Sequence, residues 1–367
     1  MRENLTCGFI GLGLIGGSIA KALRQFHPDY KLIGYDIQRE NTDLAVEEGI
    51  LNISLSEIDA SFHDCDYIFL CAPVSFNDEN LIKLKQFLSP DCLLTDVGSV
   101  KTDIHSHIES LGLNAQFIGG HPMAGSERTG YINSKAILIE NAYYILTPTR
   151  EVAEEKITEY KELAASLGAI PLILSCDLHD YVTAAVSHLP HVIAASLVNL
   201  VRDKDSGNGI MKLIAAGGFK DITRIASSSP SMWQQICLTN TENISALLDD
   251  YIASLIEIRS QIEQHRDLSV YHFFDDARSY RDSFMDASSG PIKRSFTVNI
   301  EIADEPGALA SIATILALNQ ISIKNIGIVH NREQQDGVLQ IEFYEEDSIR
   351  AAGEILEHKG YVVHQGP

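Results

Sequence analysis

The first part of the chain alternates short apolar runs with longer amphipathic segments. The apolar runs cover residues 5–10, 31–35, 66–74, 92–97, 115–119, 143–147 and 169–174. Uninterrupted runs of this length between helices predict strands that are buried on both faces. We therefore predict an α/β domain over residues 1–174, with a Rossmann-type, doubly wound and mostly parallel sheet.

The pattern changes near residue 175. Strand-like runs disappear, and residues 180–201 and 231–263 carry apolar residues at helical spacing with few helix breakers. We predict an all-helical second domain over residues 175–288. By analogy with other proteins of this layout, a long helical domain after a Rossmann unit supplies a dimer interface, so we expect a homodimer.

A third, smaller pattern follows a stretch that is typical of a linker, Ser288-Ser289-Gly290-Pro291. Alternating or apolar runs at 296–302, 323–330, 338–343 and 361–364 predict four strands. Two helical segments lie between them, one ending at about residue 318 and one over 347–359. The order of these elements predicts a βαββαβ domain over residues 294–367.

Composition limits the class of partner without changing this layout. The 367 residues include 28 basic and 50 acidic side chains, for a net charge of −22. This charge disfavours nucleic acid and anionic membranes, and no uninterrupted apolar run reaches the roughly 18 residues of a membrane span. Six cysteines without a C-x-x-C pair are typical of reduced thiols, so we expect a cytoplasmic protein.

A glycine-rich loop between the first strand and the first helix provides the main functional signal. Gly11, Gly13 and Gly16 form G-x-G-x-x-G, with an apolar run before them and helix formers after them. In this motif the glycines allow a tight turn, close approach of a pyrophosphate and close packing of helix on strand. The residues expected to contact a dinucleotide are Gly11, Leu12, Gly13, Leu14, Ile15 and Gly16.

An acidic residue after the second strand indicates which dinucleotide binds. Asp36 follows Gly16 by 20 residues, where a carboxylate accepts from the ribose 2′-OH and repels a 2′-phosphate. This favours NAD over NADP, although Arg39 lies close by and an arginine there could accept a phosphate. Ligands of such sheets lie at the carboxyl ends of the strands, so Ala72, Pro73 and Ser99 are also expected around the cofactor.

The same N-terminal stretch has a second interpretation. A basic start, an apolar middle and a small-residue site at Ala20-Lys21-Ala22 imitate a secretory signal. Five glycines within residues 8–17 and the intact nucleotide pattern downstream argue against it.

Residues 119–127, with the sequence G-G-H-P-M-A-G-S-E, contain the best candidate for proton transfer. His121 lies at the predicted end of a strand, between glycines and a proline, which places it in a crevice rather than in a core. The pKa of histidine lies near neutrality, which suits a general base. A loop histidine without a role is the alternative.

Two further histidines begin a long helical segment. His188 and His191 are three residues apart and share one helix face, and Pro190 between them is expected to kink the helix. An H-x-x-H pair could supply two metal ligands, but no third ligand follows at helical spacing, so we expect no metal. Packing or substrate contact remain the two interpretations.

A basic segment further along could bind a carboxylate. Lys220 and Arg224 stand out in so acidic a chain, and Trp233, the single tryptophan, follows them. Arginine pairs with carboxylates in a planar, bidentate geometry. The alternative is a pair of solvent-exposed cations at a helix start.

Taken together, these blocks resemble the prephenate dehydrogenase family over nearly the whole chain. The motifs that carry the resemblance are the glycine-rich loop at 11–18, Asp96-Val97-Gly98-Ser99-Val100-Lys101, the block at 119–127, the block at 187–191 and the segment 217–233. The resemblance implies NAD-dependent oxidative decarboxylation of prephenate to 4-hydroxyphenylpyruvate. It also implies that His121 takes the proton of the ring hydroxyl and that Ser99 orients both groups.

The resemblance assigns the remaining roles as well. It implies that His191 and Arg224 hold the substrate, with Arg224 on a carboxylate, that His188 adds a contact, and that Glu127 and Trp233 shape or gate the pocket. The C-terminal segment resembles an ACT domain, a ferredoxin-like amino-acid-sensing module, through its D-E-P-G-A-L turn. Tyrosine is therefore the expected inhibitory effector. Its expected site comprises Asp304, Pro306, Gly307, Ala308 and Leu309.

Three other functions stay open at this point. An arogenate dehydrogenase shares the chemistry and differs in a substrate amine. A 2-hydroxyacid dehydrogenase would place its nucleotide domain between two halves of a substrate domain, whereas the first strand here begins at residue 5. A non-catalytic sensor of NAD and an amino acid would not need His121, Ser99 and Arg224.

Overall fold

The computed structural model describes residues 4–125, 128–205, 207–283, 296–302, 305, 307–329 and 337–365. It divides into two compact units, Met1–Val270 and Tyr271–Pro367. The expected linker at 288–291 lies outside the described residues. The division into three domains, at 174/175 and at 288–294, stays a prediction.

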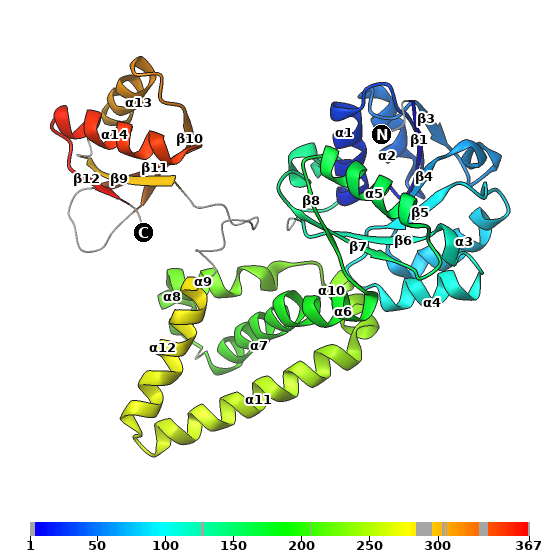
Figure 1. The fold of residues 1–367 in the computed structure, drawn as a ribbon. Helices are drawn as coiled ribbons and strands as arrows, with labels where there is room; N and C mark the ends of the chain where they lie inside the picture. Colours follow the sequence, from blue (N-terminus) through cyan, green and yellow to red (C-terminus); the bar gives the residue numbers. More distant parts are fainter. Residues whose placement is uncertain are drawn as a thin grey trace. The chain divides into compact units, whose positions relative to one another are not determined.

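A five-stranded parallel sheet forms the centre of the first unit (Figure 1). Its order is β3-β2-β1-β4-β5. The strands are β1 (Thr6–Ile10), β2 (Lys31–Tyr35), β3 (Ile53–Leu55), β4 (Tyr67–Leu70) and β5 (Leu93–Asp96). The alternating helices are α1 (Leu14–Phe26), α2 (Arg39–Glu47), α3 (Val74–Lys85) and α4 (Thr102–Ser110). The predicted Rossmann-type parallel sheet is confirmed; β3, only three residues long, was not predicted.

A second sheet of three strands follows. It has the order β6-β7-β8, with β6 (Ile118–Pro122), β7 (Tyr143–Pro148) and β8 (Ile170–Ile173). β6 is antiparallel to β7, and α5 (Glu154–Ser166) connects β7 to its parallel neighbour β8. A single parallel bridge, Leu94 to Phe117, joins the two sheets. β6 therefore runs in the direction of β5, and both strands end at the same edge.

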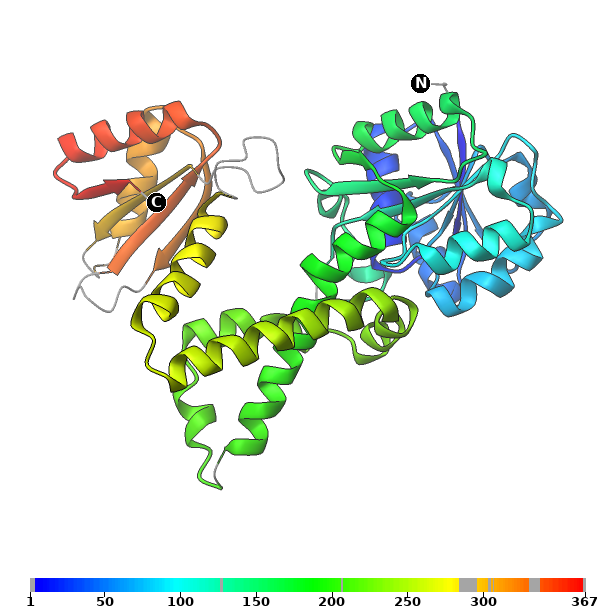
Figure 2. The same ribbon diagram turned by 60° about the horizontal axis from the view of Figure 1, so that its bottom comes forward.

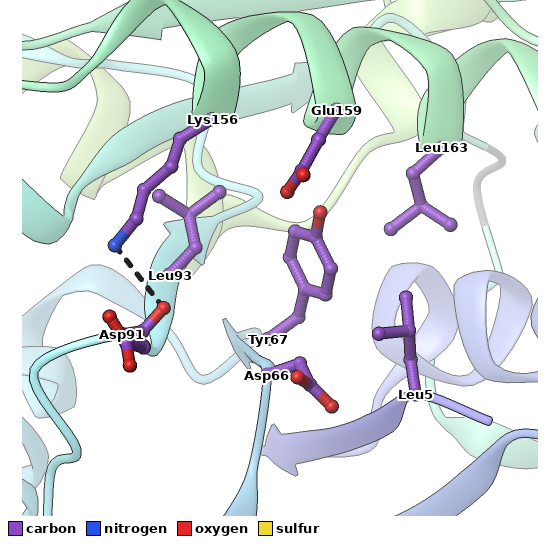
Figure 3. A pocket seen from close by; sticks show the side chains of 8 residues that line it. All are labelled: Leu5, Asp66, Tyr67, Asp91, Leu93, Lys156, Glu159 and Leu163. Atoms are coloured by element: carbon purple, nitrogen blue, oxygen red, sulfur yellow. Dashed lines mark hydrogen bonds between the residues drawn. The ribbon is translucent and has the colours of Figure 1, made fainter. Parts of the chain in front are cut away.

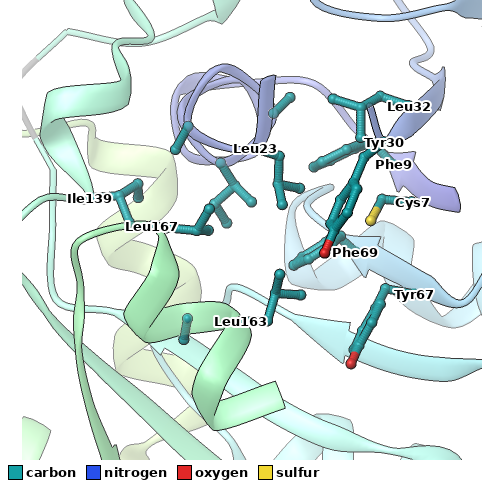
Figure 4. Close-up of a cluster of buried hydrophobic side chains, with 14 of the residues drawn as sticks. Cys7, Phe9, Leu23, Tyr30, Leu32, Tyr67, Phe69, Ile139, Leu163 and Leu167 are labelled. Carbon is teal, nitrogen blue, oxygen red and sulfur yellow. The ribbon is translucent and has the colours of Figure 1, made fainter. Parts of the chain in front are cut away.

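Helices cover both faces of the parallel sheet (Figure 1, Figure 2). Phe9 and Phe69 stack at 5.1 Å between ring centroids on one face, where α1 and α5 cover them. Figure 4 shows this cluster, with Leu23 and Leu163 facing the strand side chains. Ile10 and neighbours on the other face pack under α3 and α4. Full burial of one such side chain contributes about 1.5–3 kcal/mol, so these two clusters hold the α/β region together.

The rest of the first unit is helical, as predicted. Its helices are α6 (Cys176–Thr183), α7 (Leu189–Lys204), α8 (Ile210–Ile214), α9 (Gly217–Thr223), α10 (Pro230–Thr239) and α11 (Thr241–Glu263). A π-helical turn, η5 (Ala184–His188), connects α6 to α7. Pro190 lacks an N–H and cannot complete a regular α-helical hydrogen bond. The chain therefore widens by one π turn before Pro190, at the place where a kink was expected.

Short 3₁₀ turns complete the first unit. They are η1 (Ala60–Asp64), η2 (Asn114–Gln116), η3 (Tyr131–Asn133), η4 (Ala136–Leu138) and η6 (Arg224–Ser227). The continuous helical run Cys176–Lys204 has the length and apolar composition of a membrane span. Only 17% of its apolar window is buried within the described residues. Most of this apolar window is therefore exposed among the described residues.

The second unit has the predicted βαββαβ order. After α12 (Asp267–Ser283) come β9 (Phe296–Ile302), α13 (Ala308–Leu318), β10 (Ile323–Val329), β11 (Gly337–Phe343), α14 (Glu346–His358) and β12 (Val363–Gln365). The antiparallel sheet has the order β10-β11-β9-β12, which is a ferredoxin-like topology. Val298, Ile312 and Leu356 belong to its own hydrophobic core.

Candidate active site

Four strand ends meet at one edge of the α/β region. β1, β4 and β5 are parallel neighbours, and β6 runs alongside β5. The glycine-rich loop follows β1, Ala72 and Pro73 follow β4, and Ser99 follows β5, while His121 lies near the end of β6. The topology thus brings the predicted cofactor residues and the predicted base to the same edge.

Each glycine of the loop has a different environment. Gly11 has φ +87°, and a Cβ there would lie 2.5 Å from the backbone nitrogen of Ala72. A Cβ on Gly16 would lie 2.8 Å from the Cβ of Cys71, so helix and strand pack without space for a side chain. At Gly13 a Cβ would meet nothing within 4 Å. The loop therefore has an open backbone surface at Gly13, where a ligand can approach.

The start of α1 adds hydrogen-bond donors to this surface. Gly13 is the N-cap of α1 and supplies no side-chain cap. The first N–H groups of a helix have no intrahelical partner and carry the positive end of its dipole. Leu14 and Ile15 begin the helix here, and Leu12 is fully buried before it. These features fit a phosphate-bearing cofactor.

Asp36 connects the end of β2 to the glycine-rich loop. Its carboxylate accepts the Leu12 N–H at 2.5 Å and the Gln38 N–H at 2.8 Å. Arg39, the residue that left NADP open, forms an exposed ion pair with Asp43 at 3.4 Å on its own helix. The carboxylate is therefore held by backbone donors beside the loop, while the nearby guanidinium has an acidic partner of its own.

A buried ion pair fastens β5 to β6. The Lys101 side chain is fully buried, and its ammonium bonds to the Asp96 carboxylate and, at 2.8 Å, to the Gly120 carbonyl. Asp96 also accepts the N–H groups of Gly98 and Gly120. Burial lowers the pKa of Lys101, and the Asp96 charge opposes this. Because these groups are paired and hydrogen-bonded, the buried charges are compensated.

Two glycines before His121 allow β6 to lie close to this ion pair. A Cβ on Gly119 would lie 2.3 Å from Thr147 Oγ1, and one on Gly120 would lie 2.6 Å from the Asp96 carbonyl oxygen. A side chain at Gly119 would clash with Thr147 of β7, and a side chain at Gly120 would clash with the β5 backbone at Asp96. The pair Gly119-Gly120 therefore sets the position of His121 at the sheet edge.

His121 is the first member of a buried chain of hydrogen bonds. It is 9% exposed, and its Nδ1 lies 2.8 Å from Nε2 of His179. Nδ1 of His179 lies 2.7 Å from Oδ1 of Asp180. Burial, reinforced by His179, Lys101 and His188, holds the pKa of His121 well below 6.5. A neutral imidazole is thus available as a proton acceptor, more enclosed than the expected crevice residue.

The sequence interpretation missed His179 and Asp180. Both lie on α6 and are almost fully buried, and the Asp180 carboxylate accepts the N–H groups of Lys101 and Thr102 at the start of α4. Inside an apolar-periodic helix a histidine is usually read as a core residue. The adjacent acidic residue was the available signal, because two neighbouring buried polar side chains need partners outside their own helix.

A second group of predicted residues gathers on the helical side. The Trp233 ring stacks on His191 at 3.6 Å between centroids and meets the edge of His188 at 6.0 Å. Burial, with a smaller effect of the Arg224 charge, lowers the pKa of His191. Burial also lowers the pKa of His188 to about 4. The structure therefore brings His188, His191, Arg224 and Trp233 into one cluster.

The ring nitrogens of these histidines have defined partners. Nδ1 of His188 accepts from the Asn240 amide at 3.2 Å, and Nδ1 of His191 donates to the Ser187 carbonyl at 2.8 Å. The Trp233 Nε1–H is buried and has no partner among the described residues. Within the same residues, no group of three His, Cys, Asp or Glu side chains has the geometry of a metal site.

The other predicted site residues belong neither to the hydrogen-bonded chain of His121 nor to the helical cluster, or they fall outside the described residues. Ser99 is half-buried, and across the described chain no hydrogen bond joins it to His121. Glu127, Asp304 and Pro306 lie outside the described residues. Gly307 has φ +94° and is the N-cap of α13, with Ala308 and Leu309 in the first turn. Lys220 is exposed on α9.

A separate hollow lies at the opposite edge of the sheet (Figure 3). It is formed by α5 and by residues at the amino ends of the strands, and the Lys156 ammonium donates to the Asp91 carbonyl at 3.2 Å. Its lining residues are Leu5, Asp66, Tyr67, Asp91, Leu93, Lys156, Glu159 and Leu163. None of these belongs to the predicted site, so the hollow is unrelated to it.

Two family models and a curated relative match the chain. The nucleotide-binding domain of prephenate dehydrogenase matches residues 19–171, and the dimerization domain of prephenate dehydrogenase matches residues 175–275. A prephenate dehydrogenase of Bacillus subtilis is 36% identical over 352 residues, which is 95% of this chain and 94% of that protein.

Two solved structures are also similar to the chain. The prephenate dehydrogenase of A. aeolicus, in complex with hydroxyphenyl propionate and NAD+, has a TM-score of 0.73 at 34% identity, over 77% of this chain and 99% of that one. The Synechocystis arogenate dehydrogenase has a TM-score of 0.69 at 30% identity, over 76% of this chain and 100% of that one.

Proposed function

The chain belongs to the prephenate dehydrogenase family, and on this premise we propose that it converts prephenate to 4-hydroxyphenylpyruvate and CO2 with His121 as general base. It is an NAD-dependent oxidoreductase. The observation that carries the assignment of the base is the buried, neutral imidazole of His121 at the edge where the cofactor loops end.

The residues at the sheet edge fit NAD. The open backbone at Gly13 and the uncapped start of α1 suit a pyrophosphate, and the Asp36 carboxylate suits a ribose hydroxyl. The pairing of Arg39 with Asp43 favours NAD over NADP, because that guanidinium is already engaged on α2. When bound, NAD supplies the acceptor for the hydride that leaves the substrate ring. The protein binds and orients the reactants and moves one proton.

His121 first takes the proton of the ring hydroxyl and later returns it. The O–H bond of the ring hydroxyl breaks as the C4 hydride departs, and a new N–H bond forms on His121. The ring carboxylate then leaves as CO2, its bonding electrons enter the ring, and the ring oxygen takes the proton back to become a phenol. Aromatisation supplies the driving force, and His121 ends the cycle neutral. Ser99, which follows β5 at the same edge, is assigned to orient the hydroxyl.

The helical cluster is assigned to hold the dianionic substrate. Arg224 can pair with a carboxylate in a bidentate way, and His191 and His188 add polar contacts near it. The unpartnered Nε1–H of Trp233 supports a polar ligand in this cluster. Glu127 is assigned to the pocket entrance by family resemblance alone. In a chain with a net charge of −22, this local positive charge is needed for an anion to bind.

A second copy of the chain is proposed to cover the exposed apolar helix faces. The matched family domain is a dimerization domain, and α11 exposes Ile252, Leu255, Ile256 and Ile262. Contiguous exposed apolar patches on a protein surface mark interaction sites. A homodimer would also remove the apolar surface of Cys176–Lys204 from solvent.

The direct test is NADH formation with purified protein, measured with prephenate and with arogenate as separate substrates. Prephenate is expected to give the larger kcat/KM, because Arg224 and the histidine cluster suit a keto acid. A larger value with arogenate would assign the chain to that activity instead, as in its Synechocystis relative. No NADH with either substrate, despite NAD binding, would favour the non-catalytic sensor.

Tyrosine is proposed as an inhibitor that binds the C-terminal unit. The βαββαβ fold and the turn into α13 at Gly307 support this proposal. Tyrosine is expected to lower the rate of the full chain, and removal of residues 291–367 is expected to abolish this inhibition. Inhibition that persists in the shortened chain would place tyrosine in the active site.

A further inference from the structure

In the buried series of hydrogen bonds from His121 to Asp180, the partners of Asp180 determine which group donates and which accepts at each contact. The Asp180 carboxylate accepts from four groups, two of which are the backbone N–H groups of Lys101 and Thr102, both at 2.8 Å. The other two are the Thr102 hydroxyl and His179 Nδ1. Hydrogen bonds to both oxygens, including one backbone N–H to each, stabilise the ionised carboxylate over its protonated form. Asp180 is therefore an ionised acceptor.

The ionised Asp180 also determines which ring nitrogen of His179 and of His121 carries a proton. Since Asp180 only accepts, the proton between it and His179 sits on His179 Nδ1. With this single N–H on its ring, His179 has an acceptor at Nε2. The 2.8 Å contact between His179 Nε2 and His121 Nδ1 is then donated by His121. His121, also neutral, has its lone pair on Nε2.

We propose that His179 and Asp180 are positioning residues that fix His121 as the tautomer with a free Nε2 lone pair, ready to take the substrate proton. The inference rests on the proposed role of His121 as base. The arrangement is similar in logic to a catalytic triad, in which a buried carboxylate sets the tautomer and orientation of the base. Here a second imidazole stands between carboxylate and base.

The surroundings explain why such a chain is needed. The charge of Lys101, at the start of α4, acts on His121 and is balanced by Asp96 of β5, and His188 acts on it from η5 on the helical side. His179 and Asp180 contribute from α6. Among these groups Asp180 is the carboxylate connected to His121 through hydrogen bonds, so it can stabilise the imidazolium formed during turnover. His179 keeps its proton on Nδ1 throughout.

The links of the chain are themselves held in place. Hydrogen bonds from His179 and Thr102 keep the pKa of Asp180 below 3.8, although burial alone would raise it. The Asn240 amide donates to the Asp180 carbonyl at 2.8 Å and to His188 Nδ1. The same amide thus fixes the helix that carries His179 and the tautomer of His188.

The first test reads the tautomer without turnover. In full-length protein labelled with 15N-histidine, His121 is assigned by the loss of its signals in His121→Asn. We expect a protonated Nδ1 and an unprotonated Nε2 at neutral pH. A proton on Nε2 would overturn the inference. Because no substrate is present, this result is independent of whether prephenate is the substrate.

The second test separates positioning from simple packing. His179→Leu should lower kcat about 10²-fold and leave the KM for NAD within about threefold, because the base loses its fixed tautomer while the cofactor loop is untouched. His179→Gln should recover about tenfold of that loss, since its amide oxygen can accept from His121 Nδ1.

A matched control uses another histidine near the same strands. His105 on α4 is part-buried and bonds to Thr147 Oγ1 at 3.0 Å, and it is outside the chain to Asp180. His105→Leu should keep kcat within about twofold of the unmodified protein. Equal losses in His105→Leu and His179→Leu, or unchanged kcat in His179→Leu, would overturn the inference.

Discussion

The α/β region and the helical region of the first unit differ in how they are stabilised. Residues 4–175 bury apolar side chains on both faces of the sheet, in two separate clusters. In α6 to α11 the buried apolar residues of the described chain are Ala184, Ala194, Ile236 and Ile244. The first region has a core of its own, whereas the second buries little within one copy of the chain.

The polar residues of the site follow the same division. On the α/β side, His121, Asp96 and Lys101 are buried and hydrogen-bonded before any ligand arrives. On the helical side, Arg224 is exposed and His191 is half-buried. We infer that the proposed base is preorganised by the core, while the residues proposed to hold the substrate are on the more open region. His179 and Asp180 are the exception, because they begin the helical region but pack against α4.

The largest expected effect removes the preorganised base. His121→Asn should lower kcat by roughly 10²- to 10⁴-fold, the usual range for a general base, with a small change in the KM for prephenate. The measurement is steady-state NADH formation. Because the pKa of His121 is lowered, the base is protonated only at low pH, so kcat/KM of the unmodified protein should fall on the acid side below pH 6.5.

Two results would contradict the role of His121 as a preorganised base. Near-normal turnover of His121→Asn would remove the residue from the chemistry. An acid-side fall of kcat/KM well above pH 6.5 would mean that the base does not have the lowered pKa that burial gives it.

The second-largest expected effect concerns substrate binding by the helical region. Arg224→Ala should raise the KM for prephenate about 10- to 100-fold, as expected for a charge-assisted hydrogen bond of about 1.5–3 kcal/mol, with a smaller change in kcat. Arg150→Ala, which removes an exposed guanidinium from the α/β region, is the matched control and should leave KM unchanged. A loss in kcat without a change in KM would contradict the division of roles.

A pair of glycine variants tests the cofactor loop within the α/β region. Gly13→Ala adds a methyl to open space, so the stability should change by less than about 0.5 kcal/mol while the KM for NAD rises about tenfold. Gly11→Ala must keep φ +87° and meet the Ala72 backbone, so it should lower the free energy of unfolding by about 1–3 kcal/mol or more. Thermal unfolding and NAD titration separate the two, and equal destabilisation would contradict the assigned roles.

The sequence predicted the parts of this molecule that depend on local pattern. Apolar runs predicted seven of the eight strands of the first unit, and the order of glycines and His121 predicted which residues meet at the sheet edge. β3 was missed because Ile53–Leu55 is too short to form a clear run. The antiparallel pairing of β6 with β7 was missed because strand direction in the sheet depends on tertiary contacts.

The partners of the base could not be predicted for the same reason. His179 is 58 residues from His121 in the chain, and Asp180 is 79 residues from Lys101. Nothing in the local sequence shows that α6 packs on the start of α4. The ion pair of Arg39 with Asp43 likewise could not be predicted, because helical spacing allows such a pair but does not require it.

The smallest expected effect tests whether a second copy covers the helical region. Ile256 on α11 is 53% exposed and Ile82 on α3 is 64% exposed. If both faced solvent, replacing either with alanine would be neutral or slightly stabilising, because alanine is the better helix former. If a partner copy buries Ile256, Ile256→Ala should instead lower the melting temperature by a few degrees, more strongly in dilute protein, since dimer stability depends on concentration. Ile82→Ala is the control. Thermal unfolding at two protein concentrations gives the melting temperature of each variant, and light scattering gives its oligomeric state. The same small change in melting temperature in both variants would mean that this face of α11 stays uncovered.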